Sequence, residues 1–163
     1  MPMPTNRDTL RSVLIDIGLQ PVAWPLGDRH FRWAIAAAVP VWLARGSGLA
    51  GPLYRPAGAV AWASFLLIQP VIEETIFRGL LQGQWLRIRG VHRVAGFTTA
   101  NWLASALFVA MHAFVQPPVW ALAVVVPSLI YGHLRERFRS IWPSVAVHAV
   151  YNAGFALAAW MAR

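Results

Sequence analysis

The sequence contains no cysteine and no lysine, and its acidic residues are few. Without cysteine the chain can form neither disulfides nor thiolate metal sites, and a cysteine nucleophile is excluded. All 14 basic residues are arginine, against six aspartates and glutamates, which gives a formal net charge of +8. Since only 12% of the residues are charged and 58% are hydrophobic, the chain is too apolar for a soluble domain of 163 residues. We therefore expect a membrane protein.

Long segments without any charged residue run from 94 to 134 and from 140 to 162. Each is at least as long as the roughly 20 residues that cross a hydrocarbon core. Pro117 and Pro118 divide the first segment, because proline lacks the amide donor and clashes with the preceding helical turn. The pattern predicts an all-α, polytopic transmembrane helical bundle. Its helices, about five spans, are expected near residues 33–53, 57–86, 98–115, 119–134 and 141–162.

The arginines gather before the first predicted span and in the connections at residues 87–93 and 135–139. Short cytoplasmic loops are enriched in Lys and Arg, so we expect the N-terminus and both connections to face the cytoplasm. An odd number of spans then puts the C-terminus outside. The lipid bilayer, with its anionic lipids, accounts for the positive charge, and we predict no nucleic-acid partner.

The first 32 residues form a separate cytoplasmic or interfacial segment, which precedes a transmembrane domain over residues 33–163. Asp8, Asp16 and Pro21 interrupt any apolar stretch, and no small-residue cleavage site follows, so we do not expect a signal peptide. Four apolar residues share one helical face: Leu10, Val13, Leu14 and Ile17. This spacing predicts a short interfacial helix, with a poorly ordered tail as the alternative.

Two adjacent carboxylates, Glu73 and Glu74, end the charge-free run over residues 57–72. A carboxylate near the middle of a bilayer costs about 2.5 to 3.5 kcal/mol, so a pair indicates a functional site. Arg78 lies four residues after Glu74, the favoured order for an ion pair on one helix face. That pair is compatible with a structural or a functional role. Glu73 points about 100° away and has no partner in its own helix, which favours function.

Two further predicted spans carry polar residues at the same helical spacing. His112 follows Phe108 by four residues, and Asn152 follows His148 by four. A lone histidine is more often an interhelical hydrogen-bonding group, and Asn152 alone suits helix packing. Two histidines and two glutamates on neighbouring spans favour chemistry, although His148 is expected to lie about 10 Å nearer the basic end. The remaining histidines are interpreted as incidental: His30, His92 and His133.

These segments resemble the three motifs of the CPBP intramembrane proteases, which include the CAAX prenyl endopeptidases and the bacterial Abi proteins. The matching stretches are Glu73–Gly79, Phe108–His112 and His148–Asn152, and residues 132–143 are similar to the family's approach to its third motif. The resemblance covers a motif-bearing core over residues 57–158. It implies a glutamate-type endopeptidase, a hydrolase that works inside the membrane.

The resemblance also implies a role for each residue of the first two motifs. Glu73 is the general base that activates water, and His112 helps to hold or protonate the reacting groups. Glu74 and Arg78 fix the helix and the electric field around Glu73. The adjacent glutamates are expected to titrate as a coupled pair.

In the third motif, His148 and Asn152 match the family positions that stabilise the oxyanion of the tetrahedral intermediate. Two histidines and two carboxylates could also ligate zinc, which would then activate the water. We favour the version without a metal or any other cofactor, because the sequence lacks a compact HExxH pair.

The expected partner is a membrane-anchored protein or peptide substrate, cleaved during maturation of a C-terminal signal or a similar event. A short, cysteine-free chain with arginine alone resembles bacterial members, which implies the bacterial inner membrane. The alternatives are a non-enzymatic immunity or binding protein and a proton-coupled carrier. A carrier would favour paired inverted repeats with broken helices, which the sequence does not show.

Overall fold

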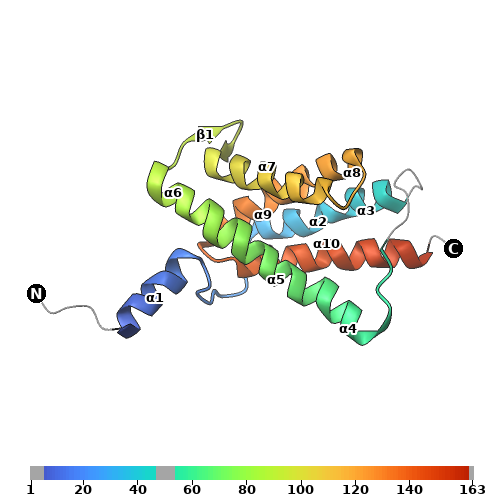
Figure 1. The fold of residues 1–163 in the computed structure, drawn as a ribbon, viewed down its shortest axis with the longest axis horizontal. Helices are drawn as coiled ribbons and strands as arrows, with labels where there is room; N and C mark the ends of the chain where they lie inside the picture. Colours follow the sequence, from blue (N-terminus) through green and yellow to red (C-terminus); the bar gives the residue numbers. More distant parts are fainter. Residues whose placement is uncertain (1–5, 47–53, 162–163) are drawn as a thin grey trace, which may run out of the picture.

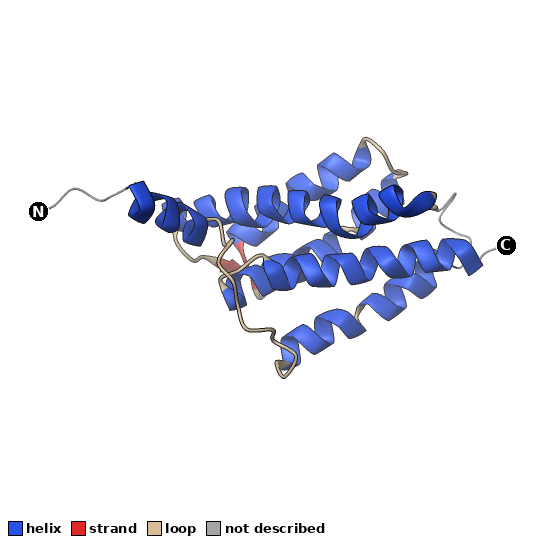
Figure 2. Ribbon diagram, turned by 90° about the horizontal axis from the view of Figure 1, so that it is seen from below, coloured by secondary structure: helices blue, strands red, loops and turns tan. Residues whose placement is uncertain are grey.

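The structure, a computed structural model, describes residues 6–46 and 54–161. It is mostly helical, as the sequence predicts (Figure 1). Within the described residues, strands occur only in one short antiparallel hairpin, β1 (Arg93–Val94) and β2 (Phe97–Thr98), drawn in red in Figure 2. The hairpin lies between the second and third predicted helices, and no strand was predicted there.

Three short helices make up the N-terminal part: α1 (Asn6–Asp16), α2 (Arg29–Ala36) and α3 (Ala38–Gly46). The Asp28 carboxylate caps α2 by accepting hydrogen bonds from the backbone N–H groups of His30 and Phe31. Arg137 donates further hydrogen bonds to this carboxylate, with Nη2 2.6 Å from Oδ2. These bonds lower the pKa of Asp28 to about 2, so the cap stays ionised at neutral pH.

The first predicted span, over residues 33–53, differs from the structure. The helix begins earlier and is interrupted at Ala37, between α2 and α3. Pro40 accounts for the interruption, because it has no N–H to donate to the carbonyl of Ala36 one turn before it. Residues 47–53 lie outside the described residues.

The second predicted span is a continuous helix of 32 residues, Gly58–Arg89. It alternates α and π segments: α4 (Gly58–Ala63), η1 (Ser64–Ile68), α5 (Gln69–Glu74), η2 (Thr75–Gln82) and α6 (Gly83–Arg89). At 1.5 Å per residue it is about 48 Å long, more than the roughly 30 Å of a hydrocarbon core, so in a bilayer it would tilt or extend beyond the core. Figure 1 shows this green helix crossing the other long helices obliquely.

The remaining helices are α7 (Thr99–Ala113), α8 (Pro118–Ala123), α9 (Val125–Phe138) and α10 (Trp142–Met161). The chain turns between α7 and α8 at Pro117, as the proline pair predicts. Among the described residues, two helices are long and apolar enough to cross a membrane, Gly58–Arg89 and Pro118–Phe138. α7 has 15 residues and α10 has 20. The arrangement with five spans stays a prediction.

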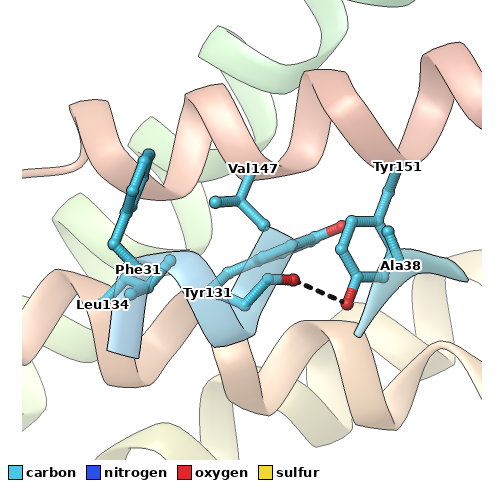
Figure 3. Close-up of a cluster of buried hydrophobic side chains, with 7 residues drawn as sticks. Phe31, Ala38, Tyr131, Leu134, Val147 and Tyr151 are labelled. Atoms are coloured by element: carbon cyan, nitrogen blue, oxygen red, sulfur yellow. Dashed lines mark hydrogen bonds between the residues drawn. The ribbon is translucent and has the colours of Figure 1, made fainter. Parts of the chain in front are cut away.

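The main apolar cluster lies where α2, α3, α9 and α10 meet: Phe31, Ala34, Ala38, Tyr131, Leu134, Val147 and Tyr151. Within it the Tyr151 hydroxyl donates a hydrogen bond to the Ala34 carbonyl oxygen at 3.3 Å (Figure 3). Trp42 Nε1 donates to the Tyr151 carbonyl oxygen at 3.1 Å. The cluster therefore joins the N-terminal helices to the two helices that carry the third motif and its approach.

α1 leads into a close backbone contact at the basic end of the bundle. A Cβ atom at Gly79 would lie 2.6 Å from the Ile17 carbonyl oxygen, and one at Gly83 would lie 3.2 Å from the Asp16 carbonyl oxygen. Arg135 Nη2 donates to that Asp16 oxygen at 2.9 Å. The two glycines, one turn apart, therefore let the N-terminal segment approach the long helix directly. The interfacial position of α1 stays a prediction.

Candidate active site

Glu73 and Glu74 are neighbours on the long helix but face different surroundings. The Glu74 side chain is fully buried, whereas that of Glu73 is 22% exposed. Glu73 lines a cavity of about 470 Å³ that helices α7 to α10 also line. Its Oε2 atom is buried and has no hydrogen-bond partner among the described residues. The helical offset between the two glutamates thus separates a cavity-lining carboxylate from an enclosed one.

Glu74 belongs to a buried polar network. Arg78 Nε donates a hydrogen bond to Glu74 Oε2 at 3.3 Å, and both side chains are inaccessible to solvent. Arg78 Nη2 donates to Ser128 Oγ on α9 at 2.7 Å. The guanidinium also lies 5.4 Å from the centre of the Phe108 ring on α7, a cation–π contact. The predicted ion pair is therefore present, and it ties the long helix to two neighbours.

His148, on α10, contacts both carboxylates. Its Nδ1 atom lies 2.9 Å from Glu74 Oε1, and its Nε2 atom lies 3.7 Å from Glu73 Oε2. An ionised carboxylate can only accept, so Nδ1 carries the proton of the shorter contact. The Tyr131 ring stacks on the imidazole, with ring centres 4.8 Å apart. The histidine is thus held in place between the glutamates and a buried aromatic ring.

His112, on α7, lines the same cavity as Glu73. Its Nδ1 atom lies 2.9 Å from the Phe108 carbonyl oxygen. A carbonyl can only accept, so Nδ1 donates, and in the neutral ring Nε2 is the nitrogen with a free lone pair. The ring also packs against the Phe108 ring at 4.3 Å between centres. The local helical bond therefore selects the tautomer of His112.

Asn152, one turn after His148, also lines the cavity. Its Nδ2 atom donates a hydrogen bond to the Phe65 carbonyl oxygen in η1 at 2.9 Å. A side-chain amide has two N–H donors, so one remains for another acceptor. The contact also fixes the first π segment of the long helix against α10.

The structure brings all six predicted site residues together. Four line the cavity, namely Glu73, His112, His148 and Asn152. Glu74 and Arg78 lie behind them in the buried network.

Two residues that were not predicted also position this group, Ser128 and Tyr131. They lie three apart and are both buried on α9. That spacing puts them on one helix face, and it was the signal in the sequence that could have identified them.

His30 and His133, which the sequence analysis interprets as incidental, contact each other in the structure. Their Nδ1 and Nε2 atoms lie 3.0 Å apart, and their rings stack with centres 5.1 Å apart.

The zinc alternative requires at least three protein ligands in one place. Within residues 6–46 and 54–161, no group of three or more His, Asp or Glu side chains is arranged to hold a metal ion. Glu74 is engaged by Arg78 and His148. The version without a metal stays a prediction.

Comparison with known protein families identifies the family of this chain. Residues 55–154 match the family described as type II CAAX prenyl endopeptidase Rce1-like, over more than half of the 163 residues. The chain belongs to this family. All three motifs lie inside the matched residues, so the resemblance to the CAAX proteases is confirmed. The Rce1-like family is a protease family, and with the two long apolar helices it identifies a membrane protein. No curated protein and no solved structure matches the chain.

Proposed function

We propose that the chain is an intramembrane endopeptidase that cleaves a membrane-anchored protein or peptide with water activated by Glu73. One observation carries the proposal: Glu73 lines the cavity with a buried Oε2 atom that has no hydrogen-bond partner among the described residues. A carboxylate in this position is free to take a proton from water in an apolar site. The membership of a protease family supports the same reaction class.

In the proposed reaction Glu73 accepts a proton from water while the water oxygen attacks the carbonyl carbon of the substrate. The carbonyl oxygen becomes an oxyanion, and the proton then passes from Glu73 to the leaving nitrogen as the C–N bond breaks. His148 Nε2 and the second N–H of Asn152 are the donors that we assign to the oxyanion. His148 donates from both nitrogens when the ring carries a proton on each.

His112 has a different part in this proposal. Since its Nδ1 atom is used by the Phe108 carbonyl, its Nε2 atom can accept the second hydrogen of the attacking water. The water would then be oriented by two acceptors, Glu73 on the long helix and His112 on α7. Holding the reacting groups in one orientation is itself a large part of catalysis.

We place this activity in the bacterial inner membrane with a cytoplasmic N-terminus. The clustering of arginine before the first predicted span and in two connections supports that orientation. The cavity is lined by α3, the long helix and α7 to α10, which is compatible with a peptide segment drawn out of a helix. We propose the metal-free mechanism because Glu74 is already engaged by Arg78 and His148.

The test compares the termini of membrane proteins in the native host by mass spectrometry. Strains carry the wild type, Glu73→Gln or His112→Gln at equal abundance. Loss of the general base is expected to slow cleavage by about 10² to 10⁴, so one or a few termini should disappear in both variants. His92→Gln is the matched control, since His92 is exposed in the second connection and outside the cavity lining. Identical termini in all strains would refute the proposal and favour a binding or immunity protein.

A further inference from the structure

A second cavity, of about 580 Å³, lies between α2, α9 and the β1–β2 hairpin. It shares no lining residue with the cavity at Glu73. Arg29, His30 and His133 line it near the helix ends that carry arginine, whereas Ala37 and Ile130 line it further along α2 and α9. Eight residues separate Arg29 from Ala37, about 12 Å along a helix. The cavity is therefore polar at the basic end and apolar towards the other.

The two histidines give the polar end a donor. Their ring nitrogens are 3.0 Å apart, so one ring donates to the other. In a pair of neutral rings the acceptor ring keeps one N–H donor on its other nitrogen. A further proton would turn both outer nitrogens into donors. The pair can therefore donate to an anionic ligand both when its rings are neutral and when it carries one further proton.

The acidic residues next to this cavity are already occupied. Asp28 is bound by Arg137, with 2.6 Å between Nη2 and Oδ2. Glu136 Oε1 accepts hydrogen bonds from Gln82 and Thr98. Arg29, which is exposed, has no acidic partner among the described residues. The positive charge at the mouth of the cavity is therefore not neutralised by the protein.

We propose that this cavity binds an anionic glycerophospholipid. Arg29 and the His30–His133 pair contact the phosphate, and an acyl chain follows the apolar lining at Ala37 and Ile130. The order of polar and apolar lining along the helices matches that of a lipid, whose phosphate lies at the interface and whose chains point to the bilayer centre. Trp33, 73% exposed on the same wall, is a residue type enriched at that interface. The site is independent of the proposed peptidase reaction.

The experiment is native mass spectrometry of the full chain, purified in detergent and freed of lipid. Phosphatidylglycerol and phosphatidylethanolamine with the same acyl chains are added separately. The wild type is expected to retain one phosphatidylglycerol in preference to phosphatidylethanolamine. Arg29→Gln is expected to weaken phosphatidylglycerol binding about fivefold, the effect of one arginine at an anionic membrane surface. Ala37→Phe fills the apolar part and is expected to abolish the bound lipid while leaving the charges in place.

Two residues of α2 that are exposed and do not line the cavity provide matched controls, Arg32→Gln and Ala36→Phe. Both are expected to bind like the wild type. Equal retention of the two lipids, or an equal loss in Arg29→Gln and Arg32→Gln, would overturn the proposal. A dimer in the spectrum that Ala37→Phe removes would assign the cavity to a second copy of the chain and would also overturn it.

Discussion

Arg78 is the central residue of the buried polar network behind the cavity. Its Nε atom bonds Glu74, and its Nη2 atom bonds Ser128. Its Nη1 atom is buried without a partner among the described residues. A buried cation is costly unless its donors are satisfied. Each existing hydrogen bond therefore contributes more to stability than it would in a neutral network. Through Glu74 the arginine also sets the position of His148.

Removing the Ser128 hydroxyl is expected to destabilise the protein more than removing a similar hydroxyl elsewhere. Ser128→Ala leaves a second guanidinium nitrogen unpaired and should cost about 1.5 to 3 kcal/mol, the range for hydrogen bonds to charged groups. Ser144→Ala is the control, because Ser144 is equally buried and donates at 2.8 Å to the neutral Tyr131 carbonyl. That change should cost about 0.5 to 1.5 kcal/mol. Reversible unfolding in mixed micelles measures both, and equal losses would contradict the charge-assisted role.

The sequence was sufficient for contacts within one helix and insufficient for contacts between helices. The bond between Glu74 and Arg78 follows from a spacing of four residues, which the helix enforces whatever surrounds it. Nothing in the spacing indicates that Ser128 meets Arg78 or that Tyr131 stacks on His148, because both depend on how α9 packs. Motif resemblance identified the six residues but not how they are arranged in space.

The oblique course of the long helix is the element that assembles the site. Counting along straight helices places His148 about 10 Å nearer the basic end than Glu74. In the structure their side chains are 2.9 Å apart, because Gly58–Arg89 crosses α10 at an angle and contains two π segments (Figure 1). The second π segment, η2, begins directly after Glu74 and includes Arg78. π segments are frequent at functional sites, and this one fits that tendency.

Gly79→Ala is expected to displace the N-terminal helix from the bundle. The added methyl group would lie 2.6 Å from the Ile17 carbonyl oxygen, which is backbone and cannot rotate away. The exchange would otherwise favour a helix by about 1 kcal/mol, so a loss can be assigned to the contact. Limited trypsin digestion at Arg7 and Arg11 measures the effect and should become several times faster. Gly27→Ala, where a Cβ atom has no neighbour within 4 Å, should leave the rate unchanged. Unaltered digestion of Gly79→Ala would show that the contact does not hold α1.

The helices and the turn at Pro117 were predictable from strong local signals, and the β1–β2 hairpin was not. Pro117 ends α7 and starts the return of the chain, as expected of a proline pair. The hairpin at residues 93–98 was not predicted because its turn has an unusual sequence. Ala95 and Gly96 both have positive φ, 50° and 85°, a conformation in which Asn-Gly or Asp-Gly is typical. Alanine rarely adopts it, so these residues do not indicate a hairpin.

The arrangement of the whole molecule depends on which helices cross the bilayer. Gly58–Arg89 and Pro118–Phe138 are long and apolar enough. α7, with 15 residues, is about 22 Å long, shorter than the roughly 30 Å of a hydrocarbon core. A short helix can still span where the bilayer thins around it. If α7 spans, the connection around residue 91 and the turn around residue 115 lie on opposite sides.

The absence of cysteine makes that arrangement directly measurable, since a single introduced cysteine has no background. Val91 and Val115 are suitable positions, 67% and 81% exposed at the two ends of α7. In intact cells an impermeant maleimide is expected to label Val115→Cys and not Val91→Cys, because the arginine-rich connection faces the cytoplasm. Permeabilised cells should label both, which controls for reactivity. The reverse pattern would invert the orientation of the protein. Equal labelling of both in intact cells would remove α7 from the spans and with it the five-span bundle.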